Sequence, residues 1–500
     1  MGPVDGGDKS GTRHSGGYDP FAARRARVLD PGRVTRRGDQ TLEPTVYVSD
    51  RILVVGVPAS RGVRDFQRFA EGEGISAQPD PRNESPPEDG SADARIWVTP
   101  LVLAPSREAT VVDAWRLLQA YRDQLAQQSP EPPEDPARGA WFEPVTVALD
   151  HLMSAGISGQ TMTYGGTMTY GGTMTYGGTM TYGGTMTYGG GARLQYAVPG
   201  LGGRTPVAAP RFTLPRTKDR PGRPVVAILD TGLGVHPWLT EDVEVLGGAI
   251  GDEPEGTGVV HDPFQGPLDD FSGHGTFIAG LVRQACPDAY IVMVKAMDAD
   301  GFVEESTMIN ALLRLAREHR EGDRRLDAVS MSFGYYHEEP GDADTDALLL
   351  RPIRDLAENG VLLVASAGND ATSRPMYPAA FAPSLGNLIS VGARNPNGTV
   401  ALFSNCGAWV EVYWAGAQVL STLPPTFNGS TQPLARVAGS ADSPERETLD
   451  IDDFSSGFSL WSGTSFAAPA FLGRCLQWGL DHPGEDRATA VKHVVRESRR

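Results

Sequence analysis

Cysteine is scarce in this chain of 500 residues, and long apolar runs are missing. Cys286, Cys406 and Cys475 form neither a disulfide framework nor a CxxC metal pair, so we expect them to be small buried apolar side chains. Residues 1–17 contain no apolar core of a secretory signal, and no stretch of about 18 apolar residues could span a bilayer. We therefore expect no membrane association and a cytoplasmic location, while export by another route stays open.

Positive charge is also in short supply. The chain has 44 Lys and Arg residues against 62 Asp and Glu residues, which gives a formal net charge of -18. Such a chain repels phosphate backbones, so nucleic acid is not an expected partner. The length predicts two or three domains with ample chain for a large core.

The N-terminal part of the chain divides into a tail and a module. Residues 1–44 are polar and aperiodic, and they are predicted to be a disordered tail. Residues 45–155 are predicted to form a small α/β module. Its expected strands are 46–57, 94–104 and 143–156, and its expected helices are 63–74 and 108–126, the latter with a buried stripe of Val111, Trp115, Leu118 and Tyr121. We find no catalytic constellation in this module.

Five identical TMTYGG hexads run from residue 161 to residue 190. A solenoid-like repeat, a short stack of hairpins and a flexible tether are the alternatives. Each TMTY run is only four residues long before Gly-Gly interrupts it, and glycine loses the most backbone entropy on ordering. The pattern favours a tether, and thirty flexible residues would span roughly 30 Å. We therefore predict a linker over residues 156–222.

Residues 223–497 are predicted to form an α/β domain with a doubly wound, mostly parallel sheet. Short continuous apolar runs suit strands buried on both faces of such a sheet, and they occur at 224–230, 289–297, 327–333, 361–368 and 388–393. Between two of them, residues 306–322 predict a helix that Ser306 caps. Its buried stripe is Ile309, Leu312, Leu313 and Ala316.

Four short motifs place polar side chains at the ends of these elements. Asp230 ends a strand in DTG, and His274 stands between two glycines in SGHGT at a helix start. Asn369 follows a strand in ASAGND, where its amide can donate to an oxyanion. Ser465, in SGTSFAAPA, opens a buried helix whose first N–H groups surround the hydroxyl. Each motif alone also fits a turn or a helix cap.

Together the motifs follow the order Asp, His, Asn, Ser that distinguishes one convergent form of the serine triad. DTGLGVHPWL, SGHGTFIAG, ASAGND and SGTSFAAP resemble the four signature blocks of the subtilisin-like serine peptidases, the subtilases. The resemblance covers about half the chain. It implies that Ser465 is the nucleophile, His274 the general base and acid, and Asp230 the residue that orients the imidazole. It also implies an oxyanion hole formed by Asn369 and the Ser465 N–H.

The same resemblance implies a substrate-binding edge and a pocket. The segment Ser332, Phe333 and Gly334 matches the edge where an extended peptide adds as a β-strand. Ala367 and Gly368 match the wall of the S1 pocket. A polypeptide is therefore the expected substrate, and the expected activity is that of a serine endopeptidase.

Acidic segments depart from the family pattern. The segment between Asp230 and His274 contains nine acidic residues from Glu241 to Asp270, and further acidic residues lie in HEEPGDADTD and from Asp442 to Asp453. An acidic rim for basic substrates, carboxylates for calcium and a solvated surface are the alternatives. No D-x-D-x-D-G loop marks a calcium site. We expect no cofactor for the chemistry, and a structural calcium ion stays possible but unassigned.

Subtilases are commonly made with an N-terminal propeptide of the size and class expected for residues 45–155. The module is therefore predicted to inhibit the protease through an intramolecular contact, or else to recruit it to another partner. Two other readings stay open. One is a catalytically silent binding scaffold, against which stands the presence of all four site residues. The other is acyl transfer without hydrolysis.

Overall fold

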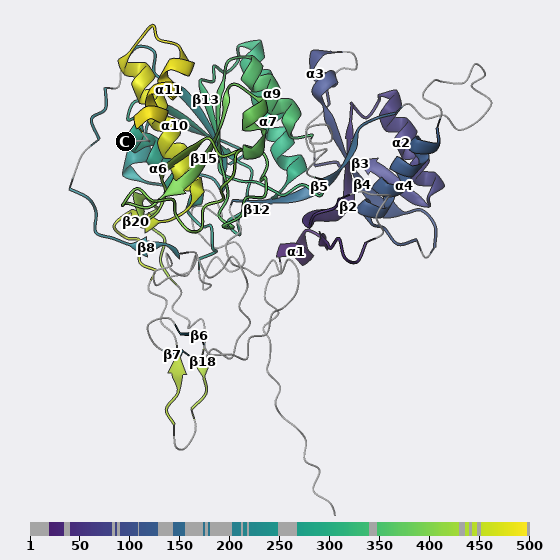
Figure 1. Cartoon of the computed structure of the whole chain (residues 1–500), viewed down its shortest axis with the longest axis horizontal. Coiled ribbons are helices and arrows are strands. Elements are labelled where there is room, and N and C mark those ends of the chain that lie inside the picture. The colour runs from purple at the N-terminus through teal and green to yellow at the C-terminus, as the bar shows by residue number, and fades with distance from the viewer. Residues whose placement is uncertain are drawn as a thin grey trace, which may run out of the picture.

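The computed structural model describes residues 20–34, 41–82, 86–87, 91–108, 110–128, 144–155, 174–175, 179–180, 203–211, 214–217, 220–248, 268–339, 348–429, 436–439, 443–447 and 452–497 (Figure 1). We use "N-terminal module" for the described residues up to 155 and "C-terminal domain" for those from 203 onward. Figure 1 shows the two units side by side, with β5 and β12 at their junction.

The N-terminal module is an antiparallel sheet covered by helices. Its elements are α1 (Pro20–Ala23), β1 (Ala26–Leu29), β2 (Thr45–Val55), α2 (Arg61–Gly72), β3 (Ile75–Pro79), α3 (Ala92–Ile96), β4 (Val98–Pro105), α4 (Ala114–Gln127) and β5 (Val147–Ser154). The side chains of Ser60 and Asp113 cap α2 and α4 by accepting hydrogen bonds from backbone N–H groups in the first turn. Phe66 and Tyr121 bring the two helices together in the module core.

Two expectations for this module need correction. Val111 lies before α4 and is 63% exposed, because the helix begins only after the Asp113 cap. The expected strand over 94–104 begins as the short helix α3, which Ser91 caps, and becomes extended only from Val98.

Part of the predicted disordered tail is ordered. Residues of β1 pair antiparallel with β2, from Ala26 with Val48 to Leu29 with Thr45, and Leu29 is buried. The guanidinium of Arg24 lies 2.7 Å from carboxylate oxygens of Asp298 and Asp300 in the C-terminal domain. These partners are distant in sequence, so the local composition gave no sign of them.

The C-terminal domain is built on a seven-stranded sheet. Its strand order is β10-β11-β9-β13-β14-β15-β16, and every neighbouring pair is parallel. The strands are β9 (Val225–Asp230), β10 (Val243–Leu246), β11 (Tyr290–Lys295), β13 (Ala328–Met331), β14 (Leu362–Ser366), β15 (Leu388–Arg394) and β16 (Val412–Ala415). This is the doubly wound parallel α/β fold that the sequence predicts.

Helices cover both faces of this sheet. They are α6 (His274–Ala285), α10 (Thr464–Asp481) and α11 (Arg487–Glu497) on one face, and α7 (Glu305–Glu321) and α9 (Leu350–Glu358) on the other (Figure 1). Residues of β9 alternate between the two cores, since Val226 and Ile228 pack with α6 and α10 while Ala227 and Leu229 pack with α7 and α9.

The remaining elements are short. They are η2 (Pro237–Leu239), η3 (Ala379–Ser384), β8 (Thr205–Pro206), β12 (Phe302–Glu304), β17 (Val419–Thr422), β18 (Arg436–Val437), β19 (Arg446–Glu447) and β20 (Phe458–Trp461). Within the hexads, β6 (Met174–Thr175) and β7 (Thr179–Met180) form a two-residue antiparallel pairing. The other hexad residues lie outside the described residues, and for the hexads the flexible tether stays a prediction. The linker predicted over 156–222 is wrong at its described end, because Arg204 is fully buried and β8 pairs with β20.

The sheet of the module continues into the C-terminal domain. Strand β12 pairs antiparallel with β5, which makes it the edge strand of the module's sheet. Apolar side chains follow the same path, because Leu53, Ala148 and Met153 of the module belong to one core with Met308 and Leu312 of α7. The two units therefore share both backbone pairing and buried apolar surface.

The start of α7 differs from the expectation. Glu304 stands at its N-cap position without a side-chain cap, and Ser306 lies inside the first turn. Asp150 of the module accepts hydrogen bonds from the Ser306 N–H at 2.9 Å and from its hydroxyl at 2.8 Å. The module thus supplies the carboxylate that satisfies this helix end.

Two further results concern the expectations from composition. Cys286 and Cys475 are buried as expected, but Cys406 is exposed, because it lies in the loop before β16 and not in a core element. Among the described helices none has the length and apolarity needed to cross a membrane.

Candidate active site

His274 and Asp230 meet at the carboxyl edge of the parallel sheet. Asp230 is the last residue of β9 and His274 the first of α6, and both side chains are buried. Nδ1 of His274 lies 2.8 Å and 3.0 Å from the two carboxylate oxygens of Asp230. An ionised carboxylate only accepts hydrogen bonds, so this contact assigns the ring proton to Nδ1 and leaves the lone pair on Nε2.

The glycines around His274 permit this contact. Gly273 has φ 81° and precedes the helix in the left-handed region. A Cβ on Gly275 would lie 2.2 Å from the carbonyl oxygen of Gly232, so only glycine lets α6 approach β9 this closely.

We expect Gly275→Ala to destabilise the fold by about 1–3 kcal/mol, because the added methyl group forces α6 away from β9. Thermal unfolding monitored by circular dichroism measures the effect. The matched control is Gly479→Ala in α10, where the added Cβ meets no atom within 4 Å. Equal unfolding temperatures for the two variants would contradict this account of the packing.

Ser465 lies in the first turn of α10, two residues after Gly463. Its hydroxyl donates a 2.7 Å hydrogen bond to the carbonyl oxygen of Ala155, which follows β5 of the module. The side chain is 2% exposed, and its backbone carbonyl accepts a hydrogen bond from the Ser332 hydroxyl at 3.0 Å. One small cavity brings the site together; its walls come from Ala155, Phe271, His274, Asn369, Trp461, Ser462, Gly463, Ser465 and Phe466.

Asn369 is held by the residue before the serine. Its Oδ1 accepts hydrogen bonds from the Thr464 N–H at 2.8 Å and from the Thr464 hydroxyl at 3.0 Å. The same hydroxyl accepts the N–H of Gly368 at 3.0 Å. Because Thr464 holds the amide oxygen of Asn369, the Nδ2 donor of that amide points away from Thr464. Asn369 also lines the cavity that contains Ser465 and His274.

The segment Ser332 to Gly334 lies beside the end of β5. Ser154 and Gly334 exchange two backbone hydrogen bonds, of 3.0 Å from the Ser154 N–H and 2.8 Å from the Gly334 N–H. The Phe333 side chain is fully buried and belongs to the same core as residues of α7 and α9. Ala367 and Gly368 lie next to Asn369, and their carbonyl oxygens accept hydrogen bonds from Asn405 at 2.9 Å each.

The end of the module is therefore held between β12 and the segment that follows β13 in the C-terminal domain. On one side Ser154 pairs with Gly334; on the other side Ala155 donates its N–H to Gly301 at 3.0 Å and β5 pairs with β12. This is the arrangement in which an extended peptide adds to exposed strand edges. The chain after Ala155 lies outside the described residues.

A buried ionic cluster at the junction was missed from the sequence. For the segment that begins with HEEP the sequence leaves an acidic rim, calcium ligands and a solvated surface open, but His337, Glu338 and Glu339 are only 2%, 1% and 6% exposed. Their partners come from the module: His151 Nε2 lies 2.8 Å from Glu338, and Arg122 pairs with Glu339. The adjacent residues Asp150 and His151 are the one feature of the sequence that could have indicated this cluster. Both lie in the otherwise apolar strand β5, and polar side chains buried in a strand need polar partners.

Burial and charge together shift the pKa values of this cluster. Burial alone would lower the pKa of His151, but the carboxylates of Glu338 and Glu305 raise it to about 10. Burial raises the pKa of Asp150 to about 6, although Arg51 and the Ser306 N–H oppose this shift. Of the nine acidic residues between Asp230 and His274, Asp252, Glu253, Glu255 and Asp262 lie outside the described residues. Asp242 and Glu244 are described and pair with Arg223 and Arg324.

Comparisons with known proteins identify the family. The model of the subtilase family matches residues 222–473. Subtilisin BL of Lederbergia lenta is 29% identical over 229 residues, covering 43% of this chain and 74% of that protein. An alkaline protease of Alkalihalobacillus alcalophilus has the same identity over 229 residues, covering 43% of this chain and 52% of that protein.

Solved structures give more distant matches. A cold-adapted subtilisin-like serine proteinase is 19% identical with a TM-score of 0.37, covering 59% of this chain and 90% of that chain. A lanthipeptide protease is 21% identical with a TM-score of 0.38, covering 55% of this chain and 79% of that chain. The family model spans half of the chain, and the chain belongs to the subtilase family.

Proposed function

We propose that this protein is a serine endopeptidase that its own N-terminal module holds inactive. The observation that carries the proposal is the 2.7 Å hydrogen bond from the Ser465 hydroxyl to the Ala155 carbonyl, made while β5 pairs with strand edges on both sides. A backbone carbonyl placed at a serine hydroxyl, in a strand-like peptide, is the geometry of a bound substrate or inhibitor.

The proposed chemistry assigns one role to each residue of the site. Ser465 Oγ attacks the scissile carbonyl while Nε2 of His274 takes its proton. Asp230 keeps the proton of His274 on Nδ1 and stabilises the imidazolium that forms. The imidazolium then protonates the leaving amine, and water hydrolyses the acyl-enzyme by the reverse sequence.

Asn369 is proposed to stabilise the oxyanion together with the N–H of Ser465. Support comes from the anchoring of its Oδ1 by Thr464, which directs Nδ2 to the other side. Because the donor is fixed before the reaction, no reorganisation is needed when negative charge develops.

The substrate is proposed to be an extended polypeptide. It would occupy the position of β5, pairing with Gly334 on one side and with β12 on the other. Mass analysis of the products from a denatured protein tests hydrolysis against peptide ligation. Fragments whose masses sum to the parent mass plus one water per cleaved bond support the endopeptidase. Ligated products, or no products from a chain whose module has been released from the site, would contradict it.

Loss of the module's edge pairing is expected to raise the initial rate of peptide hydrolysis. Ser154→Pro removes the N–H that Gly334 accepts and leaves a buried carbonyl unpaired, which costs about 1–3 kcal/mol of docking free energy. The initial rate should rise roughly 10- to 100-fold, since each 1.4 kcal/mol corresponds to a factor of about ten.

The control for this variant is Ser154→Ala, which keeps the N–H and should behave like the parent chain. The measurement is the initial rate on a short fluorogenic peptide at equal protein concentrations. An unchanged rate in Ser154→Pro, with the module still folded, would contradict inhibition and favour recruitment of a partner.

A further inference from the structure

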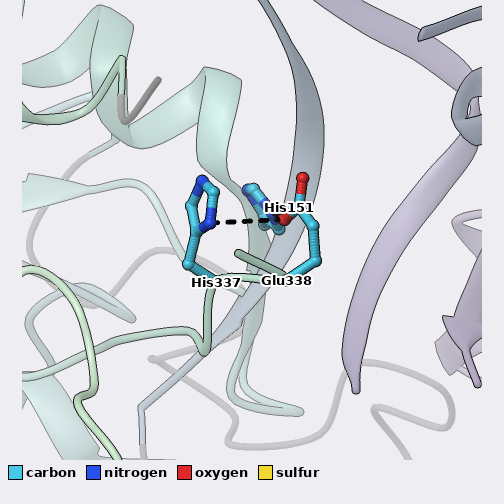
Figure 2. Close-up of side chains that lie close together, drawn as sticks. All are labelled: His151, His337 and Glu338. Atoms are coloured by element: carbon cyan, nitrogen blue, oxygen red, sulfur yellow. Dashed lines mark hydrogen bonds and ion pairs between the residues drawn. The ribbon is translucent and has the colours of Figure 1, made fainter. Parts of the chain in front are cut away.

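Three side chains with metal-binding donors converge between the module and the C-terminal domain. Figure 2 shows His151 facing His337 and Glu338, which lie together in the loop after β13. Their donor atoms all lie within 4.8 Å of one another, and each side chain is at most 2% exposed. The site therefore joins a strand of the module to a loop of the C-terminal domain.

The donor atoms of the three side chains lie close enough to share one metal ion. Nε2 of His151 lies 2.8 Å from Oε2 of Glu338, and Nδ1 of His337 lies 3.7 Å from the same oxygen. Nδ1 of His337 accepts the backbone N–H of Glu339 at 3.0 Å, so this nitrogen carries no proton, and an ion bound at Nδ1 would replace that hydrogen bond.

Glu305 lies behind His151, on the far side of its ring. Its Oε2 is 2.6 Å from Nδ1 of His151, which fixes a proton on Nδ1 and aims Nε2 at Glu338. Metal-ligating histidines commonly use this support, in which a carboxylate accepts the second ring N–H. The ring of Tyr335 stacks on His151 with centroids 4.4 Å apart, which further limits rotation of the imidazole.

The charge at this place also favours a cation. Glu305 and Glu338 bring two carboxylates into a buried region, and both lie against the single imidazole of His151. A divalent cation bound at Nε2 of His151 would balance both carboxylates.

We propose that His151, His337 and Glu338 bind one divalent ion of the zinc class across this interface. Two imidazoles and a carboxylate suit zinc and its neighbours, whereas calcium and magnesium prefer oxygen ligands alone. Bonds of about 2.0–2.1 Å at tetrahedral angles place donor atoms roughly 3.3 Å apart, so the contact between His151 and Glu338 opens by about half an ångström.

The consequence for regulation rests on the proposed function. His151 is four residues before Ala155, whose carbonyl meets the Ser465 hydroxyl. An ion that ties His151 to the C-terminal domain would hold β5 in the substrate position and strengthen inhibition. Removal of the ion would lower the affinity of the module for the site.

Zinc chloride titration of the full-length Ser465→Ala chain by calorimetry tests the site after removal of metal by a chelator. We expect one zinc ion per chain, a raised unfolding temperature and, with cobalt chloride, a visible absorption band of low-coordinate cobalt. Glu305→Gln should weaken zinc binding about 10- to 100-fold, because it alters the support of His151. His337→Asn should weaken it at least as much, while its Oδ1 can still accept the Glu339 N–H.

The matched control is His493→Gln, because His493 forms an exposed pair with Glu497 and is another candidate for weak zinc binding. Binding retained in His493→Gln but lost in His337→Asn supports the proposal. Absence of zinc binding, or undiminished binding in His337→Asn, overturns it and leaves an imidazolium between two carboxylates. The Ser465→Ala chain has no catalytic readout, so these outcomes do not depend on whether the protein is a peptidase.

Discussion

Ser465→Ala is expected to lower kcat for peptide hydrolysis by about 10⁶-fold, the loss known for the corresponding serine of the relative subtilisin. The reason is that the Ser465 hydroxyl meets the Ala155 carbonyl in the cavity shared with His274 and Asn369. The other serine of that cavity, Ser462, instead accepts the backbone N–H of Gln418 at 2.8 Å. The measurement is the rate of a fluorogenic peptide under saturating substrate. Binding of the module should persist, because the strand pairing does not involve this hydroxyl.

The control for this substitution is Ser384→Ala, whose hydroxyl bonds only to the nearby Phe381 carbonyl in η3. It should retain the parental rate. If Ser465→Ala kept a substantial fraction of that rate with intact folding, Ser465 would not be the nucleophile, and the proposed mechanism would fail.

Asn369→Ala is expected to lower kcat by about 10²–10³-fold with little change in KM, a range known from the oxyanion-hole asparagine of subtilisin. The effect on kcat alone follows because the amide donor acts on charge that develops only in the transition state. Steady-state kinetics on the same peptide separates the two parameters.

The control for Asn369→Ala is Asn395→Ala, an exposed amide in a turn that bonds to Thr399. Since Asn369 also holds Thr464, the unfolding temperature is measured beside the kinetics. A rise in KM at constant kcat would assign Asn369 to ground-state binding and contradict the oxyanion role.

The fold of the C-terminal domain could be predicted because its signals are local. Continuous apolar runs such as the one in β9 identify strands buried on both faces, and the observed sheet is parallel throughout. The residues of the candidate site can also be picked out from the sequence, since Asp230, His274 and Ser465 stand in short motifs at the ends of strands and helices. Glycines such as Gly275 belong to those motifs because a side chain would collide with the backbone of Gly232.

The contacts between the two units could not be predicted, because they depend on partners far apart in sequence. Ser306 looks like a helix cap, yet Asp150 from the module satisfies that helix end. His337 and Glu338 look like part of an acidic surface segment, yet the module buries them against His151. Local composition reports the polarity of such residues and not which surface will cover them.

Covalent labelling with a fluorophosphonate probe tests the central claim most directly, because the probe reacts with an activated serine hydroxyl. Parent chain, Ser154→Pro and Ser465→Ala are labelled in parallel, and the modified peptide is located by mass spectrometry. The account predicts a label on Ser465 that forms slowly in the parent, roughly 10- to 100-fold faster in Ser154→Pro and not at all in Ser465→Ala. A folded Ser154→Pro chain that leaves Ser465 unlabelled would contradict a serine peptidase restrained by its own module.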